Sequence, residues 1–203
     1  MVVVGSGVMG QRLSGGNDAV ALLANSLATG TALVVLIWIF GPVSGAHFNP
    51  AVTLIAALRR DLPWRTALAY LPAQGAGAVL GVWYAHLMFG LPVLQVSTHV
   101  RTGADQFLAE AVATFGLLAT ILATSRFRPT ATPAAVGLYI TAAYWFTAST
   151  AFANPAAALA RSLTDTFAGI APGGVIAFIL AQTVGALAAL AVFGWLLTPR
   201  KTA

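Results

Sequence analysis

The chain has 203 residues, of which 59% are hydrophobic and only 7% are charged. Soluble domains carry about 25% charged residues, so this chain cannot cover a water-facing surface, which excludes a soluble enzyme or a soluble DNA-binding protein. The net charge of +5 comes from scattered basic residues that form no stripe suited to nucleic acid. With no cysteine, the chain has no disulfide, thiolate metal site or cysteine nucleophile.

Long apolar segments predict that the chain crosses a membrane several times. Residues 1–10 are apolar but too few to span a bilayer. We expect either the end of a first transmembrane helix, truncated here or with its true start upstream, or a short re-entrant segment. Further along the chain, five segments are long enough for full spans. These cover residues 18–40, 64–89, 105–124, 132–150 and 173–197.

Two further apolar segments, residues 49–58 and 154–163, are too short to cross a bilayer alone. Each begins with Asn-Pro-Ala after a bend rich in Gly or Ser. Short helices preceded by irregular backbone are tolerated at membrane depth only where they are buried in protein or line a wet cavity. We therefore predict two re-entrant half-helices.

The basic residues predict the orientation of the chain. Alternation of the spans puts seven of the ten Lys and Arg residues on one side of the membrane. Cytoplasmic loops carry an excess of positive charge, so we expect this side, with the C-terminus, to be cytoplasmic in a multi-pass protein of the cell inner membrane. The seven are Arg59, Arg60, Arg65, Arg126, Arg128, Arg200 and Lys201, and the other side has Arg12, Arg101 and Arg161.

The sequence contains an internal repeat. Asn49-Pro50-Ala51 recurs as Asn154-Pro155-Ala156, an interval of 105 residues, and Ala73-Gln74 recurs as Ala181-Gln182 at a similar interval. An odd number of crossings separates the two copies, so they have opposite topology. Inverted repeats of this kind are common in transport proteins, whose site lies at the midplane where broken helices meet.

We therefore predict one transmembrane domain over residues 1–203, with inverted repeats at about 1–90 and 100–198.

The repeated tripeptide has a direct physical interpretation. Asn is a favourable N-cap whose side-chain oxygen accepts from first-turn N–H groups, and Pro suits the first helical position. Two such half-helices entering from opposite sides meet N-terminus to N-terminus, so that their positive dipole ends point at one place. The amide N–H₂ group of each Asn is expected to stay free as a donor. Such a site passes neutral polar molecules and excludes cations.

The residues around the first motif, from Ser44 to Leu54, resemble the first signature loop of the major intrinsic protein family, the aquaporins and aquaglyceroporins. The second motif, the paired Ala-Gln signatures and Glu110 also resemble that family. The resemblance covers nearly the whole chain. It implies an all-α membrane protein with six transmembrane helices, the first truncated here, two half-helices, a pore in each protomer and a homotetramer in lipid. It further implies passive diffusion of water and small neutral solutes, without nucleic acid, cofactor, metal or enzymatic activity.

The narrowest point in that family is built from four positions, which the family spacing places at Thr29, Ala142, Ala151 and Ala157. The fourth is usually Arg, whereas here the arginine is Arg161, one helical turn later and about 6 Å further along the axis. We therefore predict a wide filter that is lined by small residues and nearly uncharged. This pattern is similar to the bacterial branch associated with arsenic resistance, and it favours glycerol, urea or undissociated metalloid acids.

Three other residues carry predictions. His47, before the first motif, is expected either to line the cytoplasmic half of the pore or to pack through a hydrogen bond. Glu110 is costly within an apolar run, so we expect loop backbone to satisfy it and one re-entrant loop to be held by it. Arg161 either pairs with Asp165 at i,i+4 on one helix face or reaches the outer vestibule as a donor to solutes.

Two other functions stay open at this point. A secondary transporter would also use midplane half-helices, but ion coupling usually needs an intramembrane carboxylate or lysine, and Glu110 is the one candidate. A non-conducting or structural membrane protein of the same fold is favoured by the truncated first helix. A membrane enzyme has little support, because the sequence shows no paired carboxylates, metal-ligand spacing or Ser/His/Asp set.

Overall fold

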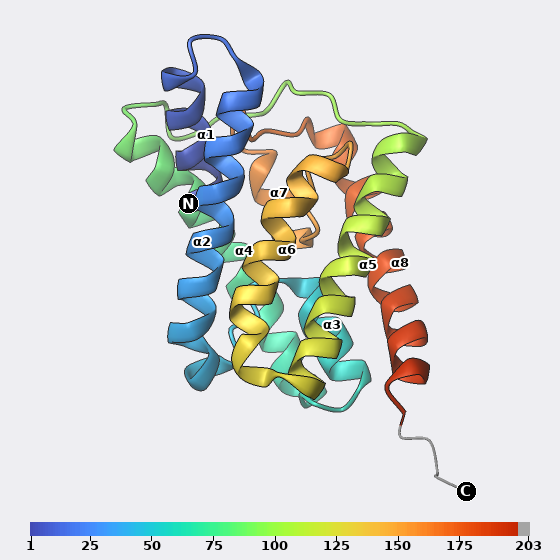
Figure 1. Ribbon diagram of the computed structural model, residues 1–203. Helices are drawn as coiled ribbons and strands as arrows, with labels where there is room; N and C mark the ends of the chain where they lie inside the picture. Colours follow the sequence, from blue (N-terminus) through green and yellow to red (C-terminus); the bar gives the residue numbers. More distant parts are fainter. Residues whose placement is uncertain (199–203) are drawn as a thin grey trace, which may run out of the picture.

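The computed structural model describes residues 1–198, and the regular structure in them is helical throughout (Figure 1). This confirms the prediction of an all-α protein in which two short helices stand among longer ones. Arg200 and Lys201, which enter the predicted orientation, lie outside the described residues. The helices are α1 (Val2–Leu13), α2 (Asp18–Ser44), α3 (Pro50–Leu58), α4 (Trp64–Met88), α5 (Ala104–Phe127), the 3-10 turn η1 (Pro129–Ala131), α6 (Thr132–Phe146), α7 (Pro155–Arg161) and α8 (Pro172–Leu196).

Within the described part of the chain, α2, α5 and α8 are the helices long and apolar enough to cross a membrane by length and composition. Helix α4 has 25 residues but does not contain a stretch apolar enough to be counted with them, and α6 has only 15 residues where about 20 are needed. The predicted span over 132–150 ends early, at Phe146, because Thr147 takes an extended conformation and begins the loop that leads to the second motif.

The outer faces of the long helices carry large exposed apolar side chains, among them Val43, Leu138, Ile176 and Trp195. Soluble monomers rarely expose continuous apolar surface of this extent. In a bilayer such faces meet hydrocarbon, while the backbone polar groups are satisfied inside the helices. The surface is therefore that of a protein whose solvent is lipid.

Close helix pairs enclose the centre of the molecule. Helix α5 packs along α8, and α2 packs along α6 (Figure 1). Glycines stand at these contacts, with Gly30 against Gly137 and Thr141, and Gly185 against Ala111. Because lipid is as apolar as the helix surfaces, membrane helices associate through this kind of close packing.

The two short helices, α3 and α7, enter from opposite ends of the bundle and approach each other near its middle (Figure 1). Both pack against α4 and α8, so each has a face buried in protein. Each begins with an Asn N-cap in extended conformation, followed by Pro in the first turn. The predicted pair of half-helices is therefore present, with opposite directions.

Polar contacts, buried around His86 and exposed around Asp165, join the loops at the α7 end of the bundle. His86 is fully buried, with Nδ1 2.8 Å from the carbonyl oxygen of Val93 and Nε2 2.8 Å from the hydroxyl oxygen of Thr164. Asp165 accepts from the backbone N–H of Thr98 at 2.8 Å and from its hydroxyl at 2.9 Å. These contacts fix the segment before α5 against the segment that follows α7.

Replacing Gly185 by alanine is expected to lower stability, because the added methyl group would overlap backbone atoms of Ala111 and Phe115 on α5. Backbone atoms cannot rotate away as a side chain can, so α5 and α8 must move apart. We expect this to lower the free energy of unfolding by about 1–3 kcal/mol. Gly194→Ala on the same helix is the control, because its methyl group meets open space and is expected to be neutral or slightly stabilising. Thermal unfolding in detergent measures both, and equal melting temperatures would contradict this packing.

A pH dependence is expected at Asp165. The backbone and side-chain hydrogen bonds from Thr98 hold the pKa of Asp165 below its usual value, because they favour the charged carboxylate. The stability that these bonds contribute is therefore present above the pKa of unfolded aspartate, and is lost as the pH falls through the lower folded pKa. The protection of the Thr98 amide against hydrogen exchange should drop in that acid range. In Asp165→Asn it should be weak at every pH, and wild-type protection that ignores pH would rule out this role.

Candidate functional site

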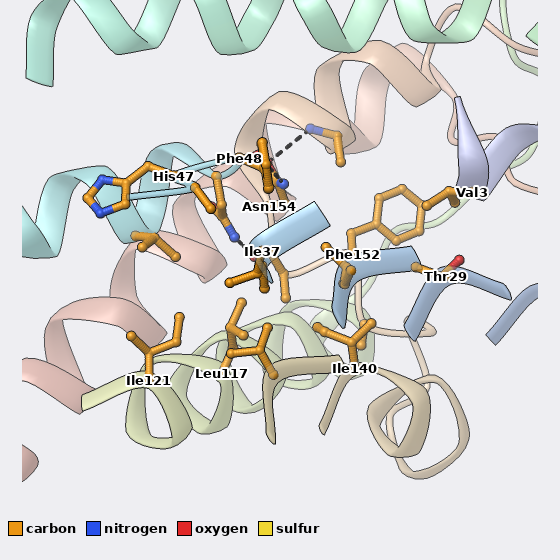
Figure 2. Close-up of a pocket in the computed structure, with 18 of the residues that line it drawn as sticks. Val3, Thr29, Ile37, His47, Phe48, Leu117, Ile121, Ile140, Phe152 and Asn154 are labelled. Carbon is orange, nitrogen blue, oxygen red and sulfur yellow. Dashed lines mark hydrogen bonds between the residues drawn. The ribbon is translucent and has the colours of Figure 1, made fainter. Parts of the chain in front are cut away.

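A cavity of about 290 Å³ lies in the middle of the bundle, where the two half-helices meet. Its two sides differ in chemistry: Leu117, Ile121 and Ile140 form an apolar wall opposite Phe48 and Asn154 (Figure 2). A molecule in this cavity therefore meets hydrogen-bonding groups on one side and hydrocarbon on the other.

A second cavity, of about 650 Å³, continues from the first toward the far end of α3. Arg59 and Arg126 line it, and so do apolar residues of α5 and α8. The two cavities share part of their lining, so they adjoin each other between the centre of the bundle and this end. The shared residues are Gly45, His47, Val52, Ile121 and Ser125.

The asparagine of each Asn-Pro-Ala motif caps its own half-helix at the cavity. Oδ1 of Asn49 accepts from the N–H of Ala51 at 2.9 Å. Oδ1 of Asn154 accepts from the N–H groups of Ala156 at 3.0 Å and Ala157 at 3.2 Å. The caps satisfy N–H groups that a helix start would otherwise leave unpaired, and they orient each side-chain amide.

Each asparagine also donates to the loop that precedes the other motif. Nδ2 of Asn49 donates to the carbonyl oxygen of Ala153 at 2.7 Å, and Nδ2 of Asn154 donates to that of Phe48 at 3.0 Å (Figure 2). The sequence analysis predicted that both amide N–H₂ groups would stay free as donors. The structure shows instead that each is partly used. One N–H of each is used in this cross-link and the second is left for a ligand. The two half-helices are fixed to each other as well as capped.

The backbone before each motif takes a conformation that is rare for L-residues. Ala46 and Ala151, which are 105 residues apart like the motifs themselves, have φ of 53° and 46°, and Ala153 also has a φ of 46°. Left-handed conformation in a non-glycine residue costs of order 1–3 kcal/mol and persists where the surroundings enforce it. The repeat therefore extends to the shape of the two loops.

Glu110 holds the loop that precedes α7. It is fully buried on α5, and its carboxylate accepts from the N–H groups of Phe152 at 2.8 Å and Ala153 at 2.9 Å. The side-chain amide of Gln182 on α8 donates to the same carboxylate at 2.6 Å. Three donors surround the charge, as a carboxylate removed from water requires.

Gln74 on α4 holds the loop before α3, as Glu110 holds the loop before α7. Its amide donates to the backbone carbonyl of His47 and to the hydroxyl of Thr53, the latter at 2.8 Å. The repeated Ala-Gln signature therefore places an amide beside each re-entrant loop. His47 itself lines both cavities and packs edge-on against Tyr70, with 5.8 Å between ring centroids.

Of the four positions predicted for the filter, Thr29, Ala151 and Ala157 line the central cavity. Ala142 does not, because it is exposed on α6. Two residues along a helix rotate a side chain by about 200°. The residue that faces the cavity from α6 at this level is accordingly Tyr144, whose hydroxyl lies 3.4 Å from that of Thr29.

Arg161 lines the same cavity and is only 4% exposed. Its Nε donates to the carbonyl of Ala168, and its guanidinium lies over the ring of Phe152, 3.2 Å from the ring centroid. The alternative of an Arg161–Asp165 pair on one helix face does not occur, because α7 ends at Arg161 and Asp165 is bound to Thr98. The cavity at this level is thus neither uncharged nor lined by small residues alone.

The sequence analysis missed Phe152 and Tyr144. The one signal for Phe152 is its place in the loop two residues before Asn154, and nothing in the apolar pattern distinguishes Tyr144 from Trp145 or Phe146. Within residues 1–198 no three His, Asp or Glu side chains gather in a way that would hold a metal ion.

Comparison with known proteins shows the family to which the chain belongs. The family profile described as Major intrinsic protein matches residues 1–164. The chain is 59% identical over 199 residues to the aquaglyceroporin AqpS of Rhizobium meliloti (strain 1021), which covers 98% of this chain and 85% of that protein. Because almost none of the chain is left out, this match includes both half-helices.

Two more distant relatives match over shorter stretches. Aquaporin NIP1-1 of Oryza sativa subsp. japonica is 43% identical over 74 residues, which are 36% of this chain and 26% of that protein. The glycerol uptake facilitator protein of Streptococcus pneumoniae (strain ATCC BAA-255 / R6) is 33% identical over 110 residues, which are 48% of this chain and 47% of that protein.

Glu110→Gln is expected to lower the free energy of unfolding by about 2–4 kcal/mol, because an amide of the same shape cannot accept from all three donors around it. Asp61→Asn is the control, since Asp61 is an exposed carboxylate paired with Arg59 at 2.7 Å, a contact worth about 0–1 kcal/mol. Thermal unfolding in detergent compares the two variants. If both lose the same small amount, Glu110 does not anchor the loop.

Proposed function

Because the chain belongs to the major intrinsic protein family, we propose that it is a passive channel for water and small neutral solutes, with the two Asn-Pro-Ala motifs at the centre of its pore. The family consists of membrane channels and not enzymes. The observation that supports the proposal is the pair of adjoining cavities inside the bundle, the central one of which is lined by two cross-linked asparagines that each keep one N–H for a ligand.

The chemistry of the central cavity supports a neutral solute with both hydroxyl and carbon surface. A solute oxygen can accept from the remaining N–H of Asn49 and of Asn154, while the positive ends of the half-helix dipoles repel cations. The opposite wall of Leu117, Ile121 and Ile140 offers no hydrogen bond, so strongly hydrated ions lose water without replacement. We infer that glycerol, urea and undissociated metalloid acids are the fitting solutes.

We infer further that the chain lies in the bacterial plasma membrane as a homotetramer, with the end marked by Arg59 and Arg126 and the C-terminus in the cytoplasm. Support for this orientation comes from the cavity at the far end of α3, which both arginines line. The apolar outer faces of α2 and α8 support the proposed membrane location, because lipid or neighbouring protomers must cover them.

The contacts of Glu110 favour a channel over an ion-coupled transporter. Its carboxylate already accepts three hydrogen bonds from the loop and from α8. A coupling carboxylate must instead bind and release an ion or a proton during the cycle. Glu110 is thus a structural anchor in this proposal.

Stopped-flow light scattering on proteoliposomes tests the proposal. Vesicles that contain the chain are expected to shrink in sucrose faster than empty vesicles and to re-swell rapidly in glycerol. Ala157→Trp puts an indole into the central cavity and should abolish both responses, whereas Leu180→Trp, on the exposed face of α8, should leave both unchanged.

Fast shrinkage without re-swelling would show a water-selective pore and would contradict the proposed solutes. Wild-type rates no higher than those of bare lipid would contradict the channel itself.

A further inference from the structure

We propose that Arg161 and Phe152 form the outer selectivity constriction of this channel, in place of residue 157. The inference rests on the proposed function and names the residues that set its specificity. In it, the guanidinium of Arg161 contacts the solute and excludes cations, and the ring of Phe152 is a positioning group that keeps the guanidinium at the cavity.

The first step is the place of Arg161. Ala157 lines the central cavity but ends in a methyl group that donates no hydrogen bond. Arg161 stands four residues later on α7, on the same helix face, and its long side chain reaches the same cavity. The charge that position 157 lacks is therefore supplied from one turn beyond it.

The second step is the state of its donors. Arg161 is 96% buried in its surroundings, since only 4% of it is exposed. Nε donates to Ala168, but the two terminal nitrogens make no hydrogen bond or ion pair with protein atoms in the part of the chain that the structure describes. Buried donors are costly without acceptors, and in this place the cavity is where a water or solute oxygen can provide them.

The third step is the platform beneath the guanidinium. The guanidinium of Arg161 lies over the ring of Phe152, 3.2 Å from the ring centroid. The guanidinium of Arg101 lies 5.3 Å from the same centroid. The ring of Phe178 packs edge-on against that of Phe152, with 5.0 Å between the ring centroids. The backbone N–H of Phe152 donates to the carboxylate of Glu110 at 2.8 Å. The ring cannot swing away without breaking these contacts, so the cation–π contact fixes the place of the charge at the cavity.

These groups together define a chemistry. The hydroxyls of Thr29 and Tyr144 lie 3.4 Å apart and line the same cavity as the guanidinium and the ring. A compact polyol fits this set, because its oxygens can accept from the guanidinium while its carbons lie against the aromatic face. A cation meets the buried positive charge of Arg161, which makes no ion pair with a carboxylate in residues 1–198, and is repelled by it.

The experiment uses the full chain in proteoliposomes and two readouts: the ratio of glycerol to water permeability by stopped flow, and proton leak by a trapped pH dye. Arg161→Gln removes the charge, Arg161→Lys keeps the charge without the planar contact, and Phe152→Leu keeps an apolar residue without the ring. The matched controls are Arg12→Gln and Phe89→Leu, since Arg12 lies 5.2 Å over the Phe89 ring in a pair that does not line the cavity.

Arg161→Gln is expected to raise proton leak about tenfold and to change the permeability ratio about as much, the size of one hydrogen bond to a charged group. Arg161→Lys should still exclude protons but should show the altered ratio, and Phe152→Leu should resemble it. The controls should match wild type. A purely structural role would instead lower both permeabilities together and leave their ratio and the leak unchanged.

The outcomes separate this inference from the channel proposal. If wild-type vesicles conduct and a folded Arg161→Gln variant keeps the wild-type ratio and proton leak, the inference is overturned while the channel stands. If Arg161→Gln does not fold, Arg161→Lys and Phe152→Leu decide, and unchanged ratios in both would overturn the inference. Wild-type vesicles that conduct no better than lipid would overturn both proposals.

Discussion

Two stretches of non-helical backbone lie in the interior of a protein whose surroundings are lipid, and their polar groups must be satisfied from within. The loop before α7 is held by the carboxylate of Glu110, and the loop before α3 by the amide of Gln74. The asparagine caps and their cross-links complete this network. The central cavity, the half-helices and the placement of Phe152 all depend on it, because without these partners irregular backbone at this depth would be too costly to keep.

How far the sequence predicts this arrangement depends on the range of the interaction concerned. An N-cap involves only a few neighbouring residues, so each Asn-Pro-Ala motif of this chain predicts a helix start from local sequence alone. Glu110 is recognisable as an anchor because an ionised residue within an apolar run needs partners. Tyr144 is different: it faces the cavity only because α6 ends at Phe146 and a loop of a particular length follows, and counting back from Asn154 leads to Ala142 instead.

Arg161 shows the same limit in another form. Its position on the α7 face follows from helical spacing, but its final place depends on a carbonyl at Ala168 and on the ring of Phe152. Both are set by loops with no periodic pattern. The two halves of the chain share their motifs, their left-handed alanines and their glutamines, and they differ in the residues that surround the second loop. The shared residues form the scaffold, and the specific ones lie where selectivity is proposed.

The reciprocal hydrogen bonds of Asn49 and Asn154 have one more consequence. A carrier exposes its site first to one compartment and then to the other, which requires its halves to rock against each other. Here each half holds the loop of its counterpart through hydrogen bonds of 2.7 and 3.0 Å, which oppose such a movement. In the proposed channel, this cross-link leaves no alternating step that could couple transport to an energy source. Solute would then move only down its concentration difference, in whichever direction that difference points.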